Sequence, residues 1–260
     1  MVMKIHAFYF SPTHTTEQLA EQVGERIKNA LSGTLEKISL TKPAARGKTY
    51  SIPHEDIFLL ALPVYGGRIP ALLETTLRNI KGNNSQAIII GVYGNRDFDD
   101  ALLEMKDLLT ENSFHVTAAG AFVGEHSFSR RLAANRPDGQ DMIAASEFAT
   151  KCAEKILAKE KTELQVKGNY PYKERNPAAP IAPKTTDDCN ACMICFNACP
   201  TQAISGENPK IADNKKCIKC FACVKSCPLS AKYFDDENIL KATVWLENSF
   251  MDRKEPEFFF

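Results

Sequence analysis

Residues 8–20 read FYFSPTHTTEQLA, and this short stretch joins an apolar run to a helical pattern through a loop of small hydroxyl side chains. The apolar run, residues 2–10, predicts a buried strand. Apolar residues then recur every four positions through residues 14–31 and predict an amphipathic helix. The loop between them either caps this helix or holds an anion at its N-terminus, since Ser and Thr suit both tasks.

The order of strand and then helix repeats through about the first 160 residues. Four more buried strands are predicted by the apolar runs at residues 35–40, 56–63, 86–93 and 116–123. Helical patterns fill the intervals at residues 68–80, 98–110 and 141–159. We therefore expect an α/β fold with a five-stranded parallel sheet in the flavodoxin-type order 2-1-3-4-5. Its ligand should lie beyond the carboxyl ends of the strands.

The composition bounds the class of protein. Hydrophobic residues make up 44% of the 260 positions, enough for a real core, and 32 basic residues balance 32 acidic ones. This balance gives no basic field for nucleic acid. No apolar run approaches the roughly 20 residues that span a bilayer, and no signal-peptide cleavage site follows the N-terminal run. We expect a cytoplasmic protein with no nucleic-acid or membrane partner.

Eight of the nine cysteines lie in two runs of identical spacing, C-x2-C-x2-C-x3-C-P. A disulfide scaffold would spread its cysteines through a small secreted domain, and zinc sites usually use two C-x2-C pairs across a longer loop. Three thiolates two residues apart instead wrap one four-iron cube, and the fourth ligates the other cube. We therefore expect two [4Fe-4S] clusters. The first takes Cys189, Cys192, Cys195 and Cys227, and the second takes Cys217, Cys220, Cys223 and Cys199.

Residues 187–235, which hold this repeat, resemble the two-[4Fe-4S] ferredoxin family. Six Lys face five Asp or Glu in this segment, so its docking face should differ from the acidic surface that the resemblance would imply. The preceding residues 165–186 carry four prolines and predict an extended, semi-rigid linker. We expect a flavodoxin-like domain at residues 1–164, this linker, the ferredoxin domain, and a C-terminal helix with an aromatic tail at residues 236–260.

The position of the hydroxyl-rich loop, directly after the first predicted strand, helps to identify the ligand that it could bind. It lacks the ending of a Walker loop, and no G-x-G-x-x-G follows any strand, so a nicotinamide-binding fingerprint is missing. The loop resembles the flavodoxin phosphate loop [ST]-x-T-G-x-T, with His14 in place of the usual Gly. The resemblance implies an FMN phosphate held by hydroxyl and N–H groups. The residues expected to bind it are Ser11, Pro12, Thr13, Thr15 and Thr16.

Two more loops leave the same edge of the predicted sheet, PVYGGRIP at residues 63–70 and VYGNRDFDDAL at residues 92–102. Each places a tyrosine and a glycine beside the presumed pocket, and a flavin ring needs aromatic walls and nearby backbone amides. A core or edge position is the alternative for each tyrosine taken alone. The residues expected to bind the ring are Pro63, Val64, Tyr65, Gly66, Gly67, Tyr93, Gly94, Asn95, Arg96, Phe98 and Asp99.

Residues 120–141 form a segment too long and polar for a plain connection. We expect it to cap the flavin or to meet the ferredoxin domain. Its His126 is either a proton donor to the flavin or a surface histidine with a structural hydrogen bond.

The whole chain resembles the EFR1 family ferredoxins through its PVYGGRIP, GNRDFDDAL and GEHSFS segments. The resemblance implies FMN and two [4Fe-4S] clusters in anaerobic metabolism. We expect an electron-transfer flavoprotein that passes electrons between the clusters and FMN and meets redox partner proteins, with a homodimer as one assembly. The alternatives are a cluster-fed FMN reductase acting on a small molecule and a redox- or oxygen-sensing partner protein.

Overall fold

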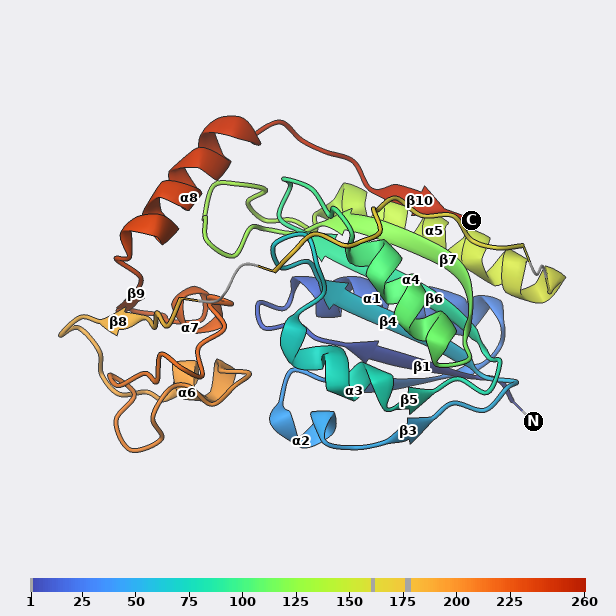
Figure 1. Ribbon diagram of the computed structural model, residues 1–260, viewed down its shortest axis with the longest axis horizontal. Helices are drawn as coiled ribbons and strands as arrows, with labels where there is room; N and C mark the ends of the chain where they lie inside the picture. The colour runs from blue at the N-terminus through green and yellow to red at the C-terminus, as the bar shows by residue number, and fades with distance from the viewer. Residues whose placement is uncertain (1, 160–161, 176–178) are drawn as a thin grey trace.

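The central sheet follows the order expected from the strand and helix repeats. The computed structural model describes residues 2–159, 162–175 and 179–260, and its parallel strands are β1 (Lys4–Tyr9), β2 (Thr34–Ser39), β4 (Ile57–Pro63), β6 (Gln86–Tyr93) and β7 (His115–Val123). They lie in the order β2-β1-β4-β6-β7 (Figure 1). This is 2-1-3-4-5 among the parallel strands, which confirms the predicted flavodoxin-like fold.

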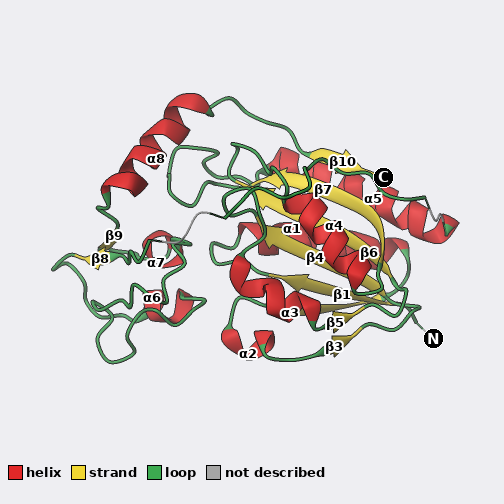
Figure 2. Cartoon of the chain, in the orientation of Figure 1, coloured by secondary structure: helices red, strands yellow, loops and turns green. Residues whose placement is uncertain are grey.

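Helices cover both faces of the sheet (Figure 2). One face is covered by α1 (Thr15–Ala30) and α5 (Gly139–Ala158), whose apolar sides pack on it through residues such as Leu19 and Phe148. The other face is covered by α4 (Ala101–Glu111) and α3 (Glu74–Arg78). Smaller elements complete this side: α2 (Pro43–Arg46), η1 (Ala71–Leu73), and the parallel pair β3 (Tyr50–Ser51) and β5 (Ile80–Lys81).

The helix predicted at residues 68–80 is shorter in the structure. Tyr65 and Arg68 pair their backbones in a tight turn, and Pro70 is extended, so the helical turns begin only at Ala71. A proline suits the entry to a helix because its fixed φ and missing N–H cost nothing there. The loop after β4 is therefore longer than expected, and it stays at the edge of the sheet.

The C-terminus adds a sixth strand that the sequence pattern did not predict. Strand β10 (Glu257–Phe259) pairs antiparallel with β7 at the edge of the sheet. The ring of Phe258 lies 5.4 Å from Phe122 and 5.0 Å from Phe148, and Phe260 also contacts Phe148. The terminal phenylalanines thus pack on the protein itself, and they cover an edge that would otherwise expose unpaired backbone groups.

The cysteine-rich module lies beyond the carboxyl ends of the parallel strands (Figure 1). It contains α6 (Ile194–Ala198), α7 (Ala222–Lys225) and an antiparallel ribbon of β8 (Lys184–Thr185) and β9 (Lys232–Tyr233). Helix α8 (Glu237–Ser249) follows, and the chain then returns to the sheet as β10. No helix in the described part of the chain is long and apolar enough to cross a membrane.

The linker is fastened to the flavodoxin-like domain along its described residues. Buried Asp100 accepts the backbone N–H of Asn169 at 2.8 Å and that of Lys173 at 2.6 Å. Buried Glu104 accepts hydrogen bonds from Arg68 at 2.7 and 2.8 Å and from Arg175 at 2.8 Å. The four prolines predict an extended connector, and two buried carboxylates hold its described residues against the flavodoxin-like domain as a strap. Residues 176–178 of the linker lie outside the described part of the chain.

Candidate functional site

The eight clustered cysteines line two small pockets, four to each. The first cysteine pocket is lined by Cys189, Cys192, Cys195 and Cys227. The second cysteine pocket is lined by Cys199, Cys217, Cys220 and Cys223. These are the two groups of four that the spacing assigns, three from one run and the fourth from the other. All nine cysteines of the chain are free thiols.

The two cysteine runs repeat the same backbone conformation. Ala191 and Met193 have φ of 59° and 64°, and their equivalents Lys219 and Phe221 have φ of 54° and 61°. Left-handed residues at these positions let successive N–H groups face the inside of a loop, an arrangement that attracts negative charge. The second run therefore copies the first in local structure as well as in spacing.

Hydrogen bonds reach the sulfur of the fourth cysteine in each run. The N–H of Ala203 donates to Sγ of Cys199 and the N–H of Ala231 to Sγ of Cys227, both at 3.2 Å. Burial raises the pKa of Cys220 to about 12. At Cys199 burial also opposes ionisation, but the N–H groups that follow it outweigh this effect and lower its pKa. The module thus favours thiolate sulfur there, the form that metals bind.

Among the described residues, no three His, Cys, Asp or Glu side chains lie close enough together to hold a single metal ion. The four cysteines of each pocket instead surround a shared space. A four-iron cube fits this donor set, because each of its irons takes one cysteine sulfur.

A third pocket of about 310 Å³, here named the interdomain pocket, lies between the edge of the sheet and the cysteine module. One part of its wall comes from Gly66, Gly67 and Gly94, in the loops that follow β4 and β6. Another part comes from Ile218 and Lys219, between two cysteines of the second run. The remaining residues of the wall are Val64, Tyr65, Arg96, Asp97, His126, Ser127, Phe128, Trp245 and Leu246.

Two glycines of the interdomain pocket have no room for a side chain. A Cβ on Gly94 would lie 2.3 Å from Cδ2 of His126, so that ring lies directly against the backbone. A Cβ on Gly67, whose φ is 89°, would lie 2.1 Å from Oδ2 of Asp99. Both positions therefore require glycine.

The residues expected around a flavin ring fall into different environments. Six of them line the interdomain pocket: Val64, Tyr65, Gly66, Gly67, Gly94 and Arg96. Tyr93 and Phe98 are buried in the core with their rings 5.5 Å apart, so neither forms a wall of that pocket. Pro63 ends β4. Asp99 lies behind Gly67, where its carboxylate pairs with Arg96 and Lys173.

Asn95 also has a different contact from the one expected. Its side-chain amide donates to the carbonyl oxygens of Phe250 at 2.6 Å and Asp252 at 2.8 Å. Its Oδ1 accepts the N–H of Lys254 at 3.3 Å. Asn95 therefore fastens the segment that joins α8 to β10.

Sequence reasoning missed the part of the interdomain pocket that comes from the module and from α8. In the sequence, Ile218 and Lys219 are intervening residues of a cysteine run, and Trp245 and Leu246 lie in the predicted C-terminal helix. No local pattern links these positions to the loop at residues 63–70. The polar segment at residues 120–141 was a usable signal, since it supplies Ser127 and Phe128 to the wall.

His126 is held neutral in the wall of the interdomain pocket. Burial, together with the charges of Lys225 and Arg96, lowers its pKa to about 4. Its Nδ1 lies 3.1 Å from the backbone N–H of Phe128, which donates to it. The neutral ring therefore carries its proton on Nε2 and can donate one hydrogen bond there.

The charged residues beside His126 hold the module. Glu125 forms an ion pair with Lys225 of α7. Burial opposes ionisation of Glu125, but this pair outweighs it and lowers the pKa of the carboxyl group. Arg130 donates to a carbonyl of α7 at 3.2 Å, and Arg131 pairs with Glu247 of α8 at 3.1 Å. The segment thus both lines the pocket and docks the module.

In the loop after β1, Ser11 caps the helix, whereas three threonines keep donor groups that have no partner among the described residues. Oγ of Ser11 accepts the N–H of Glu17 at 3.0 Å and so caps α1. The N–H and hydroxyl groups of Thr13, Thr15 and Thr16 have no hydrogen-bond partner in the part of the chain that the structure describes. Such free donors at the start of a 16-residue helix suit an anion.

His14 does not prevent the tight turn of this loop. It adopts φ 67°, the left-handed conformation for which Gly is usual. Its ring is exposed, and Nδ1 lies 2.8 Å from a carboxylate oxygen of Glu17. The ring therefore points to the surface and pairs with the first turn of α1.

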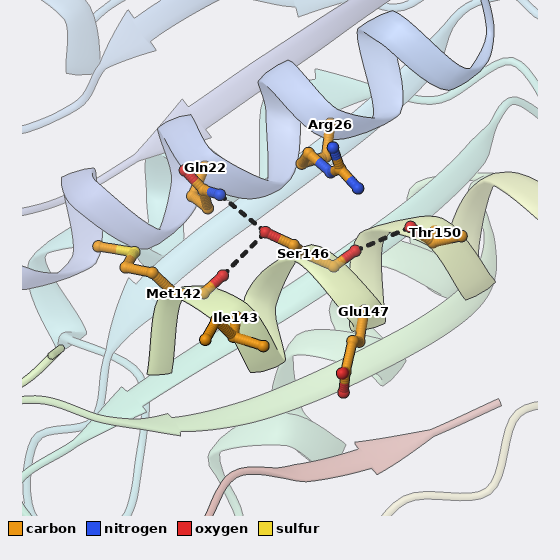
Figure 3. A pocket seen from close by; sticks show the side chains of 7 residues that line it. All are labelled: Gln22, Arg26, Met142, Ile143, Ser146, Glu147 and Thr150. Atoms are coloured by element: carbon orange, nitrogen blue, oxygen red, sulfur yellow. Dashed lines mark hydrogen bonds between the residues drawn. The ribbon is translucent and has the colours of Figure 1, made fainter. Parts of the chain in front are cut away.

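A separate groove of about 370 Å³ lies between α1 and α5 (Figure 3). Oγ of Ser146 accepts a hydrogen bond from Gln22 at 2.8 Å and donates to the carbonyl of Met142 at 2.8 Å. None of the residues that line the groove was expected to bind a cofactor. The hydrogen bond from Gln22 to Ser146 joins the two helices, so we interpret the groove as a feature of their packing.

Known proteins match the two parts of the chain separately. Residues 183–228 match the 4Fe-4S dicluster domain family. Ferredoxin-2 of Chlorobaculum tepidum is 36% identical over 56 residues, which cover 19% of this chain and 90% of that protein. The trichloroethene reductive dehalogenase of Dehalococcoides mccartyi is 33% identical over 85 residues, 26% of this chain, and the chain spans 15% of its length. A Streptococcus pneumoniae TIGR4 flavodoxin superimposes with a TM-score of 0.42 and 16% identity, covering 60% of this chain and 99% of the flavodoxin.

Proposed function

Through residues 183–228 the chain belongs to the 4Fe-4S dicluster ferredoxin family, and we propose that it is an electron-transfer flavoprotein. In this proposal two [4Fe-4S] clusters exchange electrons with an FMN held by the flavodoxin-like domain. The interdomain pocket carries the proposal, because Gly66 and Gly94 share its wall with Ile218 of the second cysteine run. The combination of a flavodoxin-like sheet and a dicluster ferredoxin domain in one chain supports membership of the EFR1 group.

The loop after β1 would hold the FMN phosphate. Thr13, Thr15 and Thr16 offer N–H and hydroxyl groups that no described residue binds, and the dipole of α1 would offset part of the negative charge. Glu17 lies in the same turn, but the hydroxyl of Tyr9 and the ring of His14 already bind its carboxylate at 2.8 Å each. The carboxylate is thus engaged by neighbours within the protein.

The flavin ring would lie in the interdomain pocket. The loops after β4 and β6 contribute glycines to its wall, so their backbone is not covered by side chains there. Nε2 of neutral His126 offers a hydrogen bond from the same wall. Burial raises the pKa of Tyr65 well above its usual value, and the nearby sulfur of Cys220 adds to the shift. Tyr65 lines the interdomain pocket together with Ile218 and Lys219 of the second run, which supports close placement of the two redox groups.

The two groups of four cysteines would each hold one cluster. When bound, each cluster supplies one-electron steps and FMN supplies steps of one or two electrons. The chain's own part is to hold these groups near each other and to exclude water. Phe128 and Phe221 serve this second task, since their rings meet between the interdomain pocket and the second cysteine pocket.

The charged side chains of the segment at residues 120–141 are bound within the protein, which favours an electron carrier over a reductase of a small molecule. An open cavity near Glu125, His126, Arg130 and Arg131 would indicate a substrate site for such a reductase. Three of these side chains are bound to the module or to α8. Of these four residues only His126 lines the interdomain pocket. The charged residues of its wall are Arg96, which pairs with Asp99, together with Asp97 and Lys219.

Anaerobic reconstitution with excess iron, sulfide and FMN tests the proposed function. We expect about eight irons and one FMN per chain. In a reductive titration followed by absorbance, the clusters and the flavin should both become reduced. A protein that takes up iron but no FMN would contradict the proposal, and so would a flavin that stays oxidised beside reduced clusters.

A further inference from the structure

Equivalent positions of the two cysteine runs place different side chains beside the two cysteine pockets. Five positions after its fourth cysteine, the first run has Ile204 and the second run has Lys232. Ile204 is 3% exposed and lines the second cysteine pocket, whereas Lys232 is 2% exposed and lines the first. The backbone before them is alike, since Ala203 and Ala231 each donate to the sulfur of the fourth cysteine at 3.2 Å. The repeat therefore places a buried lysine at one pocket and an apolar side chain at the other.

The amino group of Lys232 is held by uncharged oxygen atoms. Its Nζ donates to Oγ1 of Thr185 at 2.6 Å and to the carbonyl oxygen of Pro209. The hydroxyl of Thr185 donates its own proton to the carbonyl of Lys210 at 3.1 Å, so it accepts from Lys232. No carboxylate among the described residues pairs with Lys232, and a buried ammonium without a negative partner is unfavourable. The cysteine thiolates of the first pocket are the negative groups that share its surroundings.

The other charged residues near the two pockets are more exposed than Lys232. Asp187 is fully exposed and pairs with Lys210 at 3.2 Å, and Asp188 is exposed as well. Lys219 lies between two cysteines of the second run, but it lines the interdomain pocket and not the second cysteine pocket. Apart from the cysteine thiols, no described residue that lines the second pocket has a charged side chain. Because water screens exposed charges, Lys232 is the charge that acts most strongly on either pocket.

We infer that Lys232 raises the reduction potential of the cluster held in the first cysteine pocket above that of the cluster held in the second. The inference rests on the proposed function, which supplies the two clusters. Reduction adds negative charge to a cluster, and a buried positive charge beside it favours the reduced form. Water acts in the same direction, because Cys192 of the first run is exposed whereas its equivalent Cys220 is 8% exposed.

The order of the two potentials matters because of where the pockets lie. The second cysteine pocket shares Ile218 with the interdomain pocket, whereas the first shares no lining residue with it. Lys232 therefore favours an added electron in the pocket that is not next to the proposed flavin site. Loss of this charge would make the two potentials more nearly equal, and the electron would be shared between both pockets.

An anaerobic redox titration of the reconstituted full chain tests this inference without measuring turnover. The cluster signals are followed at each potential by electron paramagnetic resonance and by absorbance. The variants Lys232→Gln and Lys232→Met both remove the charge, and Gln keeps a hydrogen-bond donor for the neighbouring oxygen atoms. The matched control is Lys184→Gln, since Lys184 lies on β8 in the same ribbon as Lys232 but its side chain is 62% exposed.

In the wild type we expect two one-electron cluster steps at separate potentials. Both Lys232 variants should lower the higher step, with an equilibrium constant of reduction roughly tenfold smaller, or about 59 mV for one electron. The lower step should move by less. The control should change either constant by less than about twofold, because water screens its charge. An iron content equal to that of the wild type shows that each variant still holds both clusters.

Four results would overturn the inference: one potential shared by both clusters in the wild type, no shift in the Lys232 variants, a shift of the lower step instead of the higher, or an equal shift in Lys184→Gln. Loss of iron from both Lys232 variants would also overturn it, since Lys232 would then serve assembly and not the potential. Failure of the proposed function looks different, because the cluster steps then keep their dependence on Lys232 while the protein takes up no FMN or its FMN stays oxidised.

Discussion

The ring of Phe128 lies 4.6 Å from the ring of Phe221, and this contact joins the two parts of the chain. Phe128 lines the interdomain pocket, and Phe221 lines the second cysteine pocket. Phe221 stacks in turn on Phe234 at 4.4 Å. A continuous aromatic contact thus fills the space between the two proposed redox sites, and aromatic pairs add to stability beyond their buried area.

Truncation of this contact should loosen the module. We expect Phe128→Ala to lower the free energy of unfolding by about 1–3 kcal/mol, because the site loses apolar contact with Phe221 and gains water. It should also slow electron exchange between clusters and flavin, measured by rapid mixing with a reductant. Phe260→Ala is the control, since that ring packs on Phe148 at the sheet edge. An exchange rate equal to that of the wild type would count against the role of the contact.

The buried histidine should make stability depend on pH. The pKa of His126 is about 4 in the folded protein, against roughly 6.5 in an unfolded chain. The unfolded state therefore binds the extra proton between these values, and stability is lost as the pH falls through this window. From pH ~7.5 to ~5.5 this loss is about 1 kcal/mol.

The variant His126→Gln should remove that part of the pH dependence. Urea unfolding of the reconstituted wild type and variant, repeated across this pH range, measures the difference. Identical slopes of unfolding free energy against pH would show that His126 does not titrate as inferred.

The ion pair of Glu125 and Lys225 should also stabilise docking. Their side chains are 26% and 15% exposed, so Glu125→Gln leaves the Lys225 ammonium largely buried and unpaired. We expect a loss of about 1–2 kcal/mol in urea unfolding, and partial recovery when the two charges are exchanged. Glu237→Gln is the matched control, because its pair with Lys241 is exposed. A loss of the same size in that control would remove any special role for the interdomain pair.

The phosphate loop should respond differently at two neighbouring positions. Thr16→Val removes a free hydroxyl and should weaken FMN binding roughly tenfold, which is the size of one hydrogen bond to a charged group. His14→Gly should keep the affinity, since φ 67° suits glycine at least as well. Quenching of FMN fluorescence during titration of flavin-free protein measures both. Thr110→Val on α4 serves as the control, and equal binding by Thr16→Val would place the phosphate elsewhere.

The features that could be predicted are those set by local spacing. The parallel strands follow from apolar runs, and the grouping of cysteines follows from the short steps between them. Strand β10 could not be predicted in the same way, because its partner β7 lies more than a hundred positions earlier in the chain and the pairing depends on how the whole tail returns. A three-residue segment carries too little pattern of its own.

In the interdomain pocket, too, some residues could be predicted from local sequence and others could not. Its glycine loops were found because they follow predicted strands at one edge of the sheet. Ile218 and Trp245 were missed because only the docking of the module brings them there. Tyr93 was expected in the wall on the strength of its neighbour Gly94, but the direction of a side chain at the end of a buried strand is decided by packing, here against Phe98.

The return of β10 to the sheet makes the cysteine module, in chain order, an insertion within the flavodoxin-like domain rather than an appendage to it. On one side of the module the strap is bound through Asp100 and Glu104, and on the other the tail is bound through Asn95 and Phe258. A single proteolytic cut in the linker would therefore nick the chain without releasing either part. A gene fragment that stops before the module would also encode a flavodoxin-like sheet that lacks its last edge strand.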